Sequence, residues 1–168
     1  MDNAVHETTA MTHDAEMAET THDSSNTVQY IVIRLGNEQY GINIKYVENI
    51  ARMQTITRVP KAQPYFVGVI NLRGEIVPVM SLRRRFGIEE DVITNSTRII
   101  IIKPEQQATV GFIVDSVKEV VTLEEEQVEK PVSNNTDVNT FIAAVGKHGD
   151  ELISLLNIGT VINDKDQA

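Results

Sequence analysis

Residues Val69–Leu82 read "VINLRGEIVPVMSL", and in this stretch two apolar runs flank a turn at Arg73 and Gly74. Runs of this kind joined by a short glycine turn are typical of a β-hairpin. Pro78 lies within the second run, and because proline has no backbone N–H it suits an edge strand or a bulge. The stretch therefore predicts a hairpin with a basic tip, whose second strand has one unpaired or irregular side.

The hairpin has a counterpart near the other end of the chain. Residues 143–158, "AAVGKHGDELISLLNI", also hold a strand, a glycine turn with an acid after it, and a second strand. A polar residue that can cap a helix follows in each case, Ser81 in one and Asn157 in the other. A second pair of segments repeats with identical spacing: G-I-x-I-x-x-V-x-x-I from Gly41 and G-F-x-V-x-x-V-x-x-V from Gly111. The body of the chain therefore consists of two related halves.

The halves cover roughly residues 28–92 and 96–163, and turn signals every several residues give each half about five short strands. No long helical period separates the strands, which favours two small β-barrels over a βαβ sheet. The groove where two such barrels meet is a natural docking site. Whether strands exchange between the halves stays open. Residues 1–27 contain almost no branched aliphatic side chains and are expected to form a disordered tail.

Composition narrows the classes of partner. The net charge of the 168 residues is −9, but six of the 24 acids lie before Val28, where no Lys or Arg occurs, which leaves 18 acids against 15 bases in the body. A mildly acidic body does not attract phosphate backbones, and with aromatic residues at 5% it offers few stacking platforms for bases. A small barrel that binds nucleic acid is therefore kept only as the alternative function.

The chain carries few groups suited to catalysis or metal binding. It has no cysteine, which excludes a disulfide framework, a thiolate metal site and a cysteine nucleophile. His148 is the one histidine of the body and is expected at a hairpin tip, while three further histidines of the tail (His6, His13 and His22) are expected to be solvated. The basic run Arg83–Arg85 is expected on the exposed face of a short helix. We thus expect no enzyme, no catalytic residue, no metal and no cofactor.

The sequence also bears on location. It begins without the basic and apolar regions of a secretory signal, and its longest strictly aliphatic run, Ile99–Ile102, is far too short to cross a bilayer. A cytoplasmic protein without direct membrane insertion is expected.

Four segments together resemble the bacterial chemotaxis coupling protein family, CheW. The resemblance runs from about Val28 to Ile162, and it rests on "YGINIKYVENI", "ITRVP", "FVGVINLRGEIVPVMSLRRRFG" and "VGFIVDSVKEVVTL". It implies two SH3-like five-stranded β-barrels with short helices and a non-enzymatic adaptor. Members of the family link the cytoplasmic tip of methyl-accepting chemoreceptors to the CheW-like regulatory domain of the histidine kinase CheA. The protein would then associate with receptor arrays through these partners.

The resemblance also implies a binding surface. The arginine of "NLRG", here Arg73, would face the receptor, with Asn71 and Gly74 supporting its turn. The segment after the second strand contributes Val47, Asn49 and Ile50 to the receptor- or kinase-binding surface.

Two points about this segment stay open. Asn49 stands where many relatives carry glutamate, so either the neighbouring Glu48 supplies the negative charge or the contact is neutral. Val47 and Ile50 share a face if the chain turns helically there, and the matching Val117 and Val120 favour positions in the core.

Overall fold

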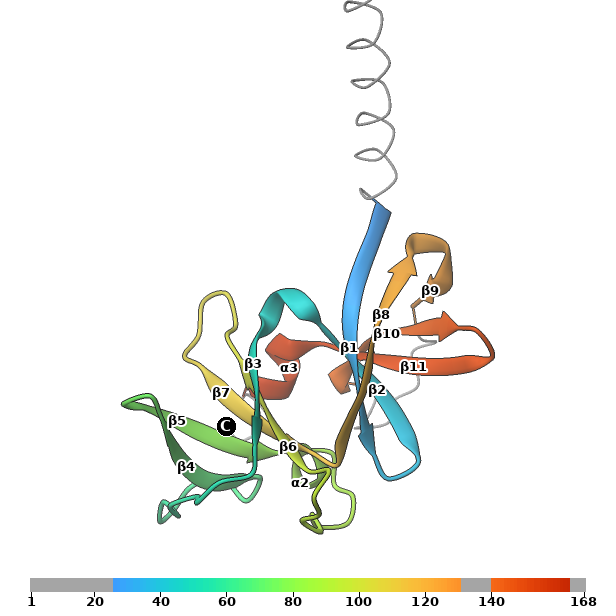
Figure 1. Cartoon of the computed structure of the whole chain (residues 1–168). Coiled ribbons are helices and arrows are strands. Elements are labelled where there is room, and N and C mark those ends of the chain that lie inside the picture. Colours follow the sequence, from blue (N-terminus) through green and yellow to red (C-terminus); the bar gives the residue numbers. More distant parts are fainter. Residues whose placement is uncertain (1–25, 131–139, 164–168) are drawn as a thin grey trace, which may run out of the picture.

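The computed structural model describes residues 26–130 and 140–163 as two curved β-sheets with two short helices between them (Figure 1). Of the expected tail, residues 1–27, the first 25 lie outside the described residues, whereas Thr27 already belongs to the first strand. In strand order, the first sheet consists of β8 (Ser116–Glu124), β1 (Thr27–Leu35), β2 (Glu38–Asn43), β11 (Glu151–Leu156), β10 (Ile142–His148) and β9 (Val128–Glu129). The second sheet consists of β3 (Val47–Arg52), β6 (Arg98–Ile102), β7 (Val110–Val114), β5 (Glu75–Ser81) and β4 (Phe66–Leu72).

The remaining elements are short. The helices are α2 (Leu82–Arg85) and α3 (Ile158–Ile162), and the 3-10 turns are η2 (Ile44–Tyr46) and η3 (Glu125–Gln127). The predicted all-β architecture of two barrel-like subdomains with short helices is confirmed. The first sheet has a sixth strand, because the two-residue β9 adds to it beside β10. Among the described residues, no helix has the length and apolar character needed to cross a bilayer.

The two halves of the sequence both contribute strands to each sheet. β1 and β2 come from the first half, but they pair with β8 and β11 of the second. β6 and β7 come from the second half and pair with β3 and β5 of the first. The strand exchange that the sequence left open is therefore present. The boundary between the two sequence repeats, at residues 92–96, is not a boundary between the two sheets.

The repeated glycines explain one requirement of this arrangement. β2 and β11 run parallel with Gly41 opposite Leu155, and β7 and β5 run parallel with Gly111 opposite Val79. A Cβ atom at Gly41 would lie 2.7 Å from Leu155 Cδ2, and one at Gly111 would lie 2.8 Å from Ile99 Cγ2. Leu155 lies on the parallel partner of β2, whereas Ile99 lies on β6, the antiparallel neighbour of β7. Both repeat positions thus need a residue without a side chain, although the close neighbours lie on different kinds of strand pair.

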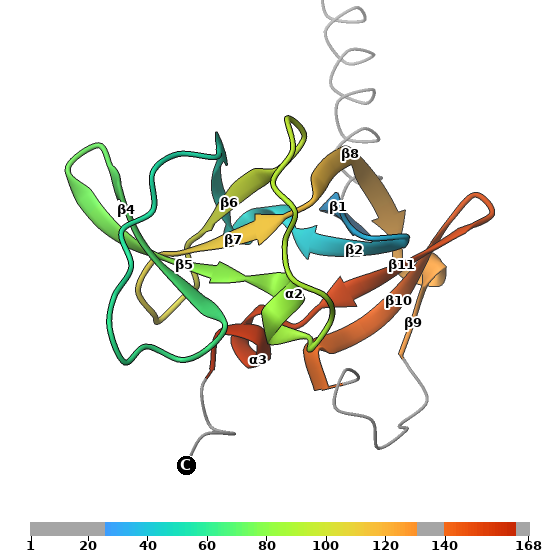
Figure 2. The ribbon, with the colours of Figure 1, turned by 90° about the horizontal axis from the view of Figure 1, so that it is seen from below.

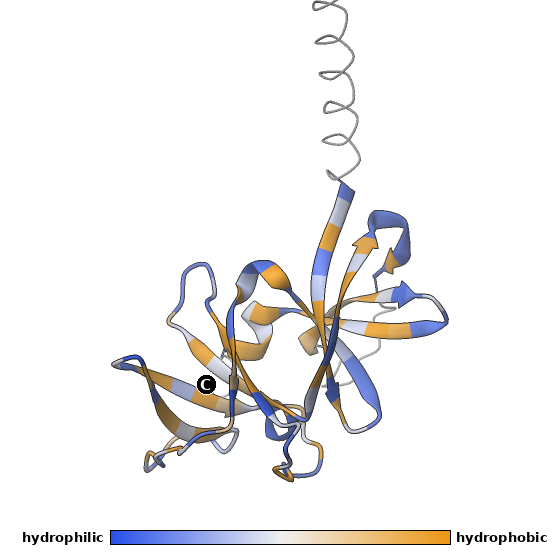
Figure 3. Cartoon of the chain, in the orientation of Figure 1, coloured by the Kyte–Doolittle hydropathy of each residue, from blue (hydrophilic) through white to orange (hydrophobic). Residues whose placement is uncertain are grey.

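The main hydrophobic core is shared by the two sheets. Its buried members include Ile33 and Ile42 of the first sheet and Met80, Ile102 and Phe112 of the second. Figure 3 shows that the strands carry most of the apolar residues, whereas the hairpin tips are hydrophilic. Since burial of apolar area is the main favourable term in folding, neither half can complete its core alone.

The helices lie next to each other where the sheets meet (Figure 2). Both N-caps are those that the sequence predicts: Ser81 Oγ accepts a hydrogen bond from the Arg84 N–H, and Asn157 Oδ1 accepts one from the Thr160 N–H, each at 3.2 Å. A serine or asparagine cap satisfies a backbone donor that would otherwise lack a partner inside the helix.

The basic run Arg83–Arg85 is not an exposed helix face, so this expectation is wrong. All three side chains are half-buried. Arg85 donates hydrogen bonds at 2.8 Å to the backbone carbonyls of Val161 and Asn163 at the end of α3. Its guanidinium also lies over the rings of two buried aromatic residues, Tyr65 and Phe141. The acceptors come from residues more than 70 positions away, which a local sequence pattern cannot show.

Arg83 ties α2 to the connection between β7 and β8. Its Nε donates to Asp115 Oδ1 at 2.8 Å, and the Gly36 N–H donates to Asp115 Oδ2 at the same distance. The hydrogen bond from Arg83, aided by that from Gly36, holds the pKa of the Asp115 carboxyl below its ordinary value although partial burial acts against this. The basic run therefore stabilises the fold.

Candidate functional site

The β4–β5 hairpin presents Arg73 to solvent. Arg73 and Gly74 both adopt left-handed backbone conformations, with φ of 54° and 84°, between the paired residues Leu72 and Glu75. Two such residues in succession are typical of the type I′ turn of two-residue hairpins. Asn71 Oδ1 accepts a hydrogen bond from the Gly74 N–H at 2.9 Å. Asn71 and Gly74 thus lie where they support the turn, and the Arg73 side chain is exposed.

Pro78 explains why this hairpin projects from its sheet. β5 lies between β4 and β7 in the strand order, but it pairs with β7 only over Val79–Ser81. Pro78 precedes this pairing and lies opposite Val69 of β4 alone. The residues from Glu75 to Pro78 therefore have one unpaired side, as the sequence indicates, and they carry the tip of the hairpin beyond β7.

The segment Val47–Arg52 is a strand, so the helical alternative that the sequence left open is wrong for this segment. The 3-10 turn ends at Tyr46, and from there the chain pairs with β6. Along a strand, residues three positions apart face opposite sides. Val47 accordingly packs against the main core, whereas Ile50 points outward and is 40% exposed.

The same division occurs in the other repeat. Val117 packs against the main core, and Val120 is 49% exposed. Only the first residue of each pair is therefore a core residue, and Ile50 is available on the surface of β3.

A hollow of about 230 Å³ lies between β3 and the β4–β5 hairpin. It brings together two residues that the sequence places at the binding surface, Asn49 and Arg73, from segments more than 20 positions apart. Val47 and Ile50 belong to the same strand but do not line the hollow. The other lining residues are Glu48, Leu72, Glu75, Val77, Ile101 and Thr109.

The hollow has an apolar floor and a charged rim. Val77 and Ile101 are buried, whereas Glu48, Arg73 and Glu75 are exposed. None of these three charged side chains forms an ion pair with another residue in the ranges 26–130 and 140–163. Asn49 is half-buried, and its Oδ1 accepts a hydrogen bond from the Ile50 N–H at 2.8 Å. The rim therefore offers charges that are free to contact another molecule.

Several residues that line the hollow were not predicted, among them Glu75 and Thr109. Glu75 could have been inferred from the two-residue turn, because the hairpin register pairs it with Leu72, the residue before Arg73. Thr109 precedes β7 and joins the hollow only because β7 lies next to β5, a long-range pairing that no local pattern indicates.

No group of three or more His, Asp or Glu side chains among the described residues could hold a metal ion. His148 lies at the end of β10, opposite Glu151, next to the turn at Gly149, and is half-buried. His148 is not among the residues that line the hollow between β3 and the hairpin.

Comparison with known proteins gives matches over nearly all of the folded body. A family profile described as a CheW-like domain matches residues 29–166. The chain is 37% identical over 134 residues to a chemotaxis protein CheW of Bacillus subtilis, covering 79% of this chain and 85% of that protein. It is 30% identical over 141 residues to a chemotaxis protein CheW of Klebsiella aerogenes, covering 83% and 84%.

A solved structure shares the fold. The crystal structure of the scaffolding protein TtCheW from Thermoanaerobacter tengcongensis superposes with a TM-score of 0.76 at 32% sequence identity, covering 82% of this chain and 93% of that chain. The likeness extends across both sheets, since it includes most of the described residues.

Proposed function

Because the chain belongs to the family of proteins with a CheW-like domain, we propose that it is a scaffold of bacterial chemotaxis that couples methyl-accepting chemoreceptors to the histidine kinase CheA. The observation that carries this proposal is the match of nearly the whole folded body to chemotaxis proteins and to a scaffolding protein of the same fold. The coverage of 85% of the Bacillus subtilis relative supports a shared role for the whole chain.

The receptor- or kinase-binding surface in this proposal comprises Val47, Asn49, Ile50 and Arg73, with Asn71 and Gly74 as the supporting turn. Three observations support it: Arg73 is exposed at the tip of the hairpin, Asn49 lines the same hollow, and Ile50 is an exposed apolar side chain on β3. Val47 contributes by fixing the start of β3 against the core. Arginine is a common anchor in protein interfaces.

The mechanism requires no bond chemistry and no cofactor. A scaffold transmits a signal when its binding free energy differs between two conformations of the kinase. Individual contacts need only be modest, since an array links many of them. We propose that the protein works in the cytoplasm, held at receptor arrays by its partners and without inserting into the membrane itself. The nucleic-acid alternative gains no support from the relatives described above.

Co-sedimentation tests the proposal. A chemoreceptor cytoplasmic fragment is assembled on lipid vesicles, and the protein is added with and without CheA. We expect the protein to sediment with the receptor alone, and the kinase to sediment in larger amount when the protein is present. If the protein remains in the supernatant in both mixtures, it is not a coupling protein.

A further inference from the structure

Two aromatic rings lie at equivalent places in the two sheets. Tyr65 directly precedes β4, and its carbonyl accepts a hydrogen bond at 2.8 Å from the N–H of the helix cap Ser81. Phe141 directly precedes β10, and its carbonyl accepts one of the same length from the N–H of the helix cap Asn157. Both rings are buried. The approximate symmetry that relates the two repeats therefore also relates Tyr65 to Phe141.

The guanidinium of Arg85 lies between these two rings. Its central carbon is 4.5 Å from the centre of the Tyr65 ring and 4.8 Å from the centre of the Phe141 ring. A group that contacts two symmetry-related residues lies close to the axis between them, where one group excludes a second. Counted from the two helix caps, the position of Arg85 is occupied in the other repeat by Val161, which is apolar and buried. A single cation thus occupies the centre of the approximate symmetry.

Arg85 also binds the end of the helix that carries its counterpart. Its Nε donates to the carbonyl of Val161 at 2.8 Å, and its Nη2 donates to the carbonyls of Asn163 at 2.8 Å and Thr160 at 3.3 Å. The last carbonyls of a helix lack partners inside it, and a planar guanidinium presents its donors in fixed directions. Since α2 follows β5 of the second sheet and α3 follows β11 of the first, this side chain links the two sheets in one orientation.

A second polar link also runs from α2 toward the first sheet. Arg83 donates to Asp115, which directly precedes β8 and also accepts a hydrogen bond from the N–H of Gly36. The main core between the sheets is apolar, and burial of apolar area is not directional. Two polar links at separate points of one helix prevent a rotation that the core alone would allow. The side chains of α2 therefore set the angle between the sheets.

Each sheet also carries exposed apolar side chains at equivalent positions. Ile76 of β5 and Leu152 of β11 are each 61% exposed. Ile50 of β3 and Val120 of β8 form a second equivalent pair and are exposed as well. The first sheet thus has a counterpart of the face that the proposed binding surface occupies in the second. A scaffold with two partners can hold one on each sheet, and the angle between the sheets then sets how the partners meet.

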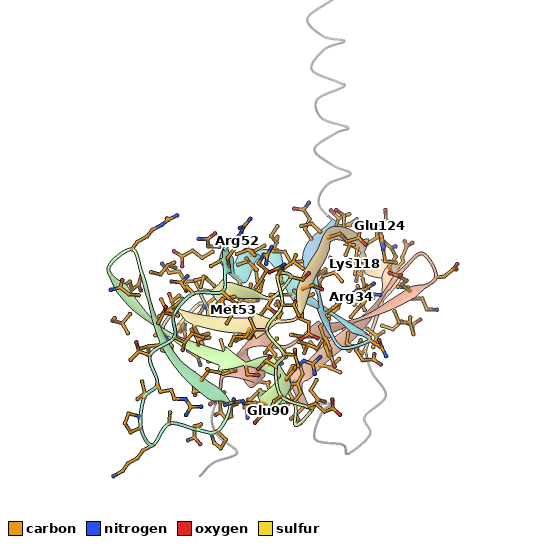
Figure 4. The ribbon with its side chains drawn as sticks, turned by 60° about the horizontal axis from the view of Figure 1, so that its bottom comes forward. Arg34, Arg52, Met53, Glu90, Lys118 and Glu124 are labelled. Carbon is orange, nitrogen blue, oxygen red and sulfur yellow. The ribbon has the colours of Figure 1, made fainter. Side chains whose placement is uncertain are left out.

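The helix that carries Arg85 lies away from the two edge strands. Figure 4 shows Arg52, at the end of β3, and Lys118 of β8 on the side of the molecule opposite Glu90, which belongs to the loop that follows α2. Arg85 itself is half-buried and donates to backbone carbonyls of α3. It can therefore affect a bound partner only through the orientation of the sheets.

We propose that Arg85 is a positioning residue of the scaffold, which holds the two sheets at the angle that presents receptor and kinase to each other. This inference rests on the proposed function and names a residue on which the joint complex depends. The proposed contact of Arg73 with the receptor needs only the second sheet, so it does not depend on Arg85. The complex of receptor, scaffold and kinase needs both sheets in their relative orientation, and so it does.

The test separates binding of one partner from assembly of both. Arg85→Met removes the guanidinium and keeps an apolar stem, whereas Arg85→Lys keeps the charge but cannot donate in the planar arrangement of a guanidinium. Arg84→Met is the matched control, because Arg84 is a half-buried arginine of the same helix whose hydrogen bond, at 3.3 Å to the Pro64 carbonyl, stays within the connection to β4.

Each protein is first titrated onto the vesicle-bound receptor fragment without kinase. CheA is then added, and the kinase that sediments is measured per molecule of bound scaffold. Thermal unfolding of each protein is recorded, so that all binding is compared well below its transition.

We expect both Arg85 variants to bind the receptor alone as the unchanged protein does, but to recruit about fivefold less kinase per bound scaffold, a change typical of coupling between two sites. Arg84→Met should match the unchanged protein in both measurements. Should Arg85→Met fail to unfold cooperatively, Arg85→Lys decides the question.

Two results would overturn the inference while leaving the proposed function intact. One is full kinase recruitment by folded Arg85→Lys. The other is a loss of receptor binding in the same proportion as kinase recruitment, which would make Arg85 a residue of general stability only. If the unchanged protein recruits no kinase to the receptor, the proposed function fails and the inference fails with it.

Discussion

Arg73 can be altered without disturbing the fold, because its side chain extends into solvent from a turn held by the Asn71 side chain and by Gly74. We predict that Arg73→Glu unfolds at nearly the temperature of the unchanged protein but binds the vesicle-bound receptor fragment about tenfold more weakly, as expected for an interface anchor. Arg58→Glu, on the exposed loop between β3 and β4, is the matched control and should bind normally. Unchanged or stronger binding of Arg73→Glu would remove Arg73 from the binding surface.

Asp115 gives a second prediction at the scale of a single residue. Its carboxylate accepts hydrogen bonds from Arg83 and from the Gly36 N–H, and its pKa is lowered in the folded protein. A carboxyl group whose pKa is lower in the folded state stabilises the protein above its unfolded pKa, and this stabilisation is lost as the pH falls through the folded value. Asp115→Asn should therefore destabilise the protein by about 1–2 kcal/mol near neutral pH.

Urea unfolding of both proteins at several pH values measures this effect. The difference in free energy of unfolding should be full above about pH 5 and should shrink as the pH falls below about 4, the ordinary pKa of an aspartate. A difference that stays constant down to about pH 3 would mean that Asp115 acts through packing and that its charge contributes nothing.

At the scale of the elements, the close approach of β2 and β11 makes Gly41 sensitive to any side chain. Gly41→Ala should destabilise the protein by about 1–3 kcal/mol, because the new methyl group meets the end of the Leu155 side chain. Shortening that neighbour by Leu155→Val should relieve part of the clash, so the double variant should lose less than the sum of the single changes.

Gly74→Ala serves as the contrast, since a Cβ there meets no atom within 4 Å and only the left-handed backbone is unfavourable. The loss in free energy of unfolding caused by Gly74→Ala should add to the loss caused by Leu155→Val. Strict additivity of Gly41→Ala with Leu155→Val, measured by chemical unfolding, would contradict the steric explanation.

The elements that the sequence predicts well are those that depend on neighbouring residues. The hairpin at Arg73 and Gly74 and the helix caps Ser81 and Asn157 follow from turn and cap chemistry within a few positions. The repeat also indicates two related halves, and it places Gly41 and Gly111 at equivalent points.

The elements that the sequence predicts badly depend on distant partners. Arg85 was expected in solvent, but its acceptors lie on α3, and the run from Val47 to Ile50 is extended because β6 pairs with it. The hollow likewise joins Asn49 to Arg73 only because β6 and β7 bring β3 and the β4–β5 hairpin into one sheet. The family resemblance indicated these residues as binding candidates, whereas local physical chemistry could not bring them together.

At the scale of the whole molecule, the exchange of β1 and β2 for β6 and β7 predicts that neither half folds alone. Fragments 26–92 and 96–163 each lack the strands that complete their sheet, and the main core takes side chains from both. Each fragment should lack a cooperative thermal transition by circular dichroism, and an equimolar mixture should regain one. A fragment that unfolds cooperatively as a monomer would show that one sheet is stable without the other half.

The exchanged strands make this chain the covalent equivalent of a domain-swapped dimer, in which two copies of one unit lend each other a hairpin. In a symmetric dimer, both equivalent sites would carry the same side chains, because the two copies have the same sequence. Joining the copies in one polypeptide removes that constraint. Lys118 and Glu48 occupy equivalent repeat positions, yet Lys118 is hydrogen-bonded to Glu151, whereas Glu48 forms no ion pair within the described residues. The two equivalent positions therefore differ in charge, although the strands that carry them are arranged alike.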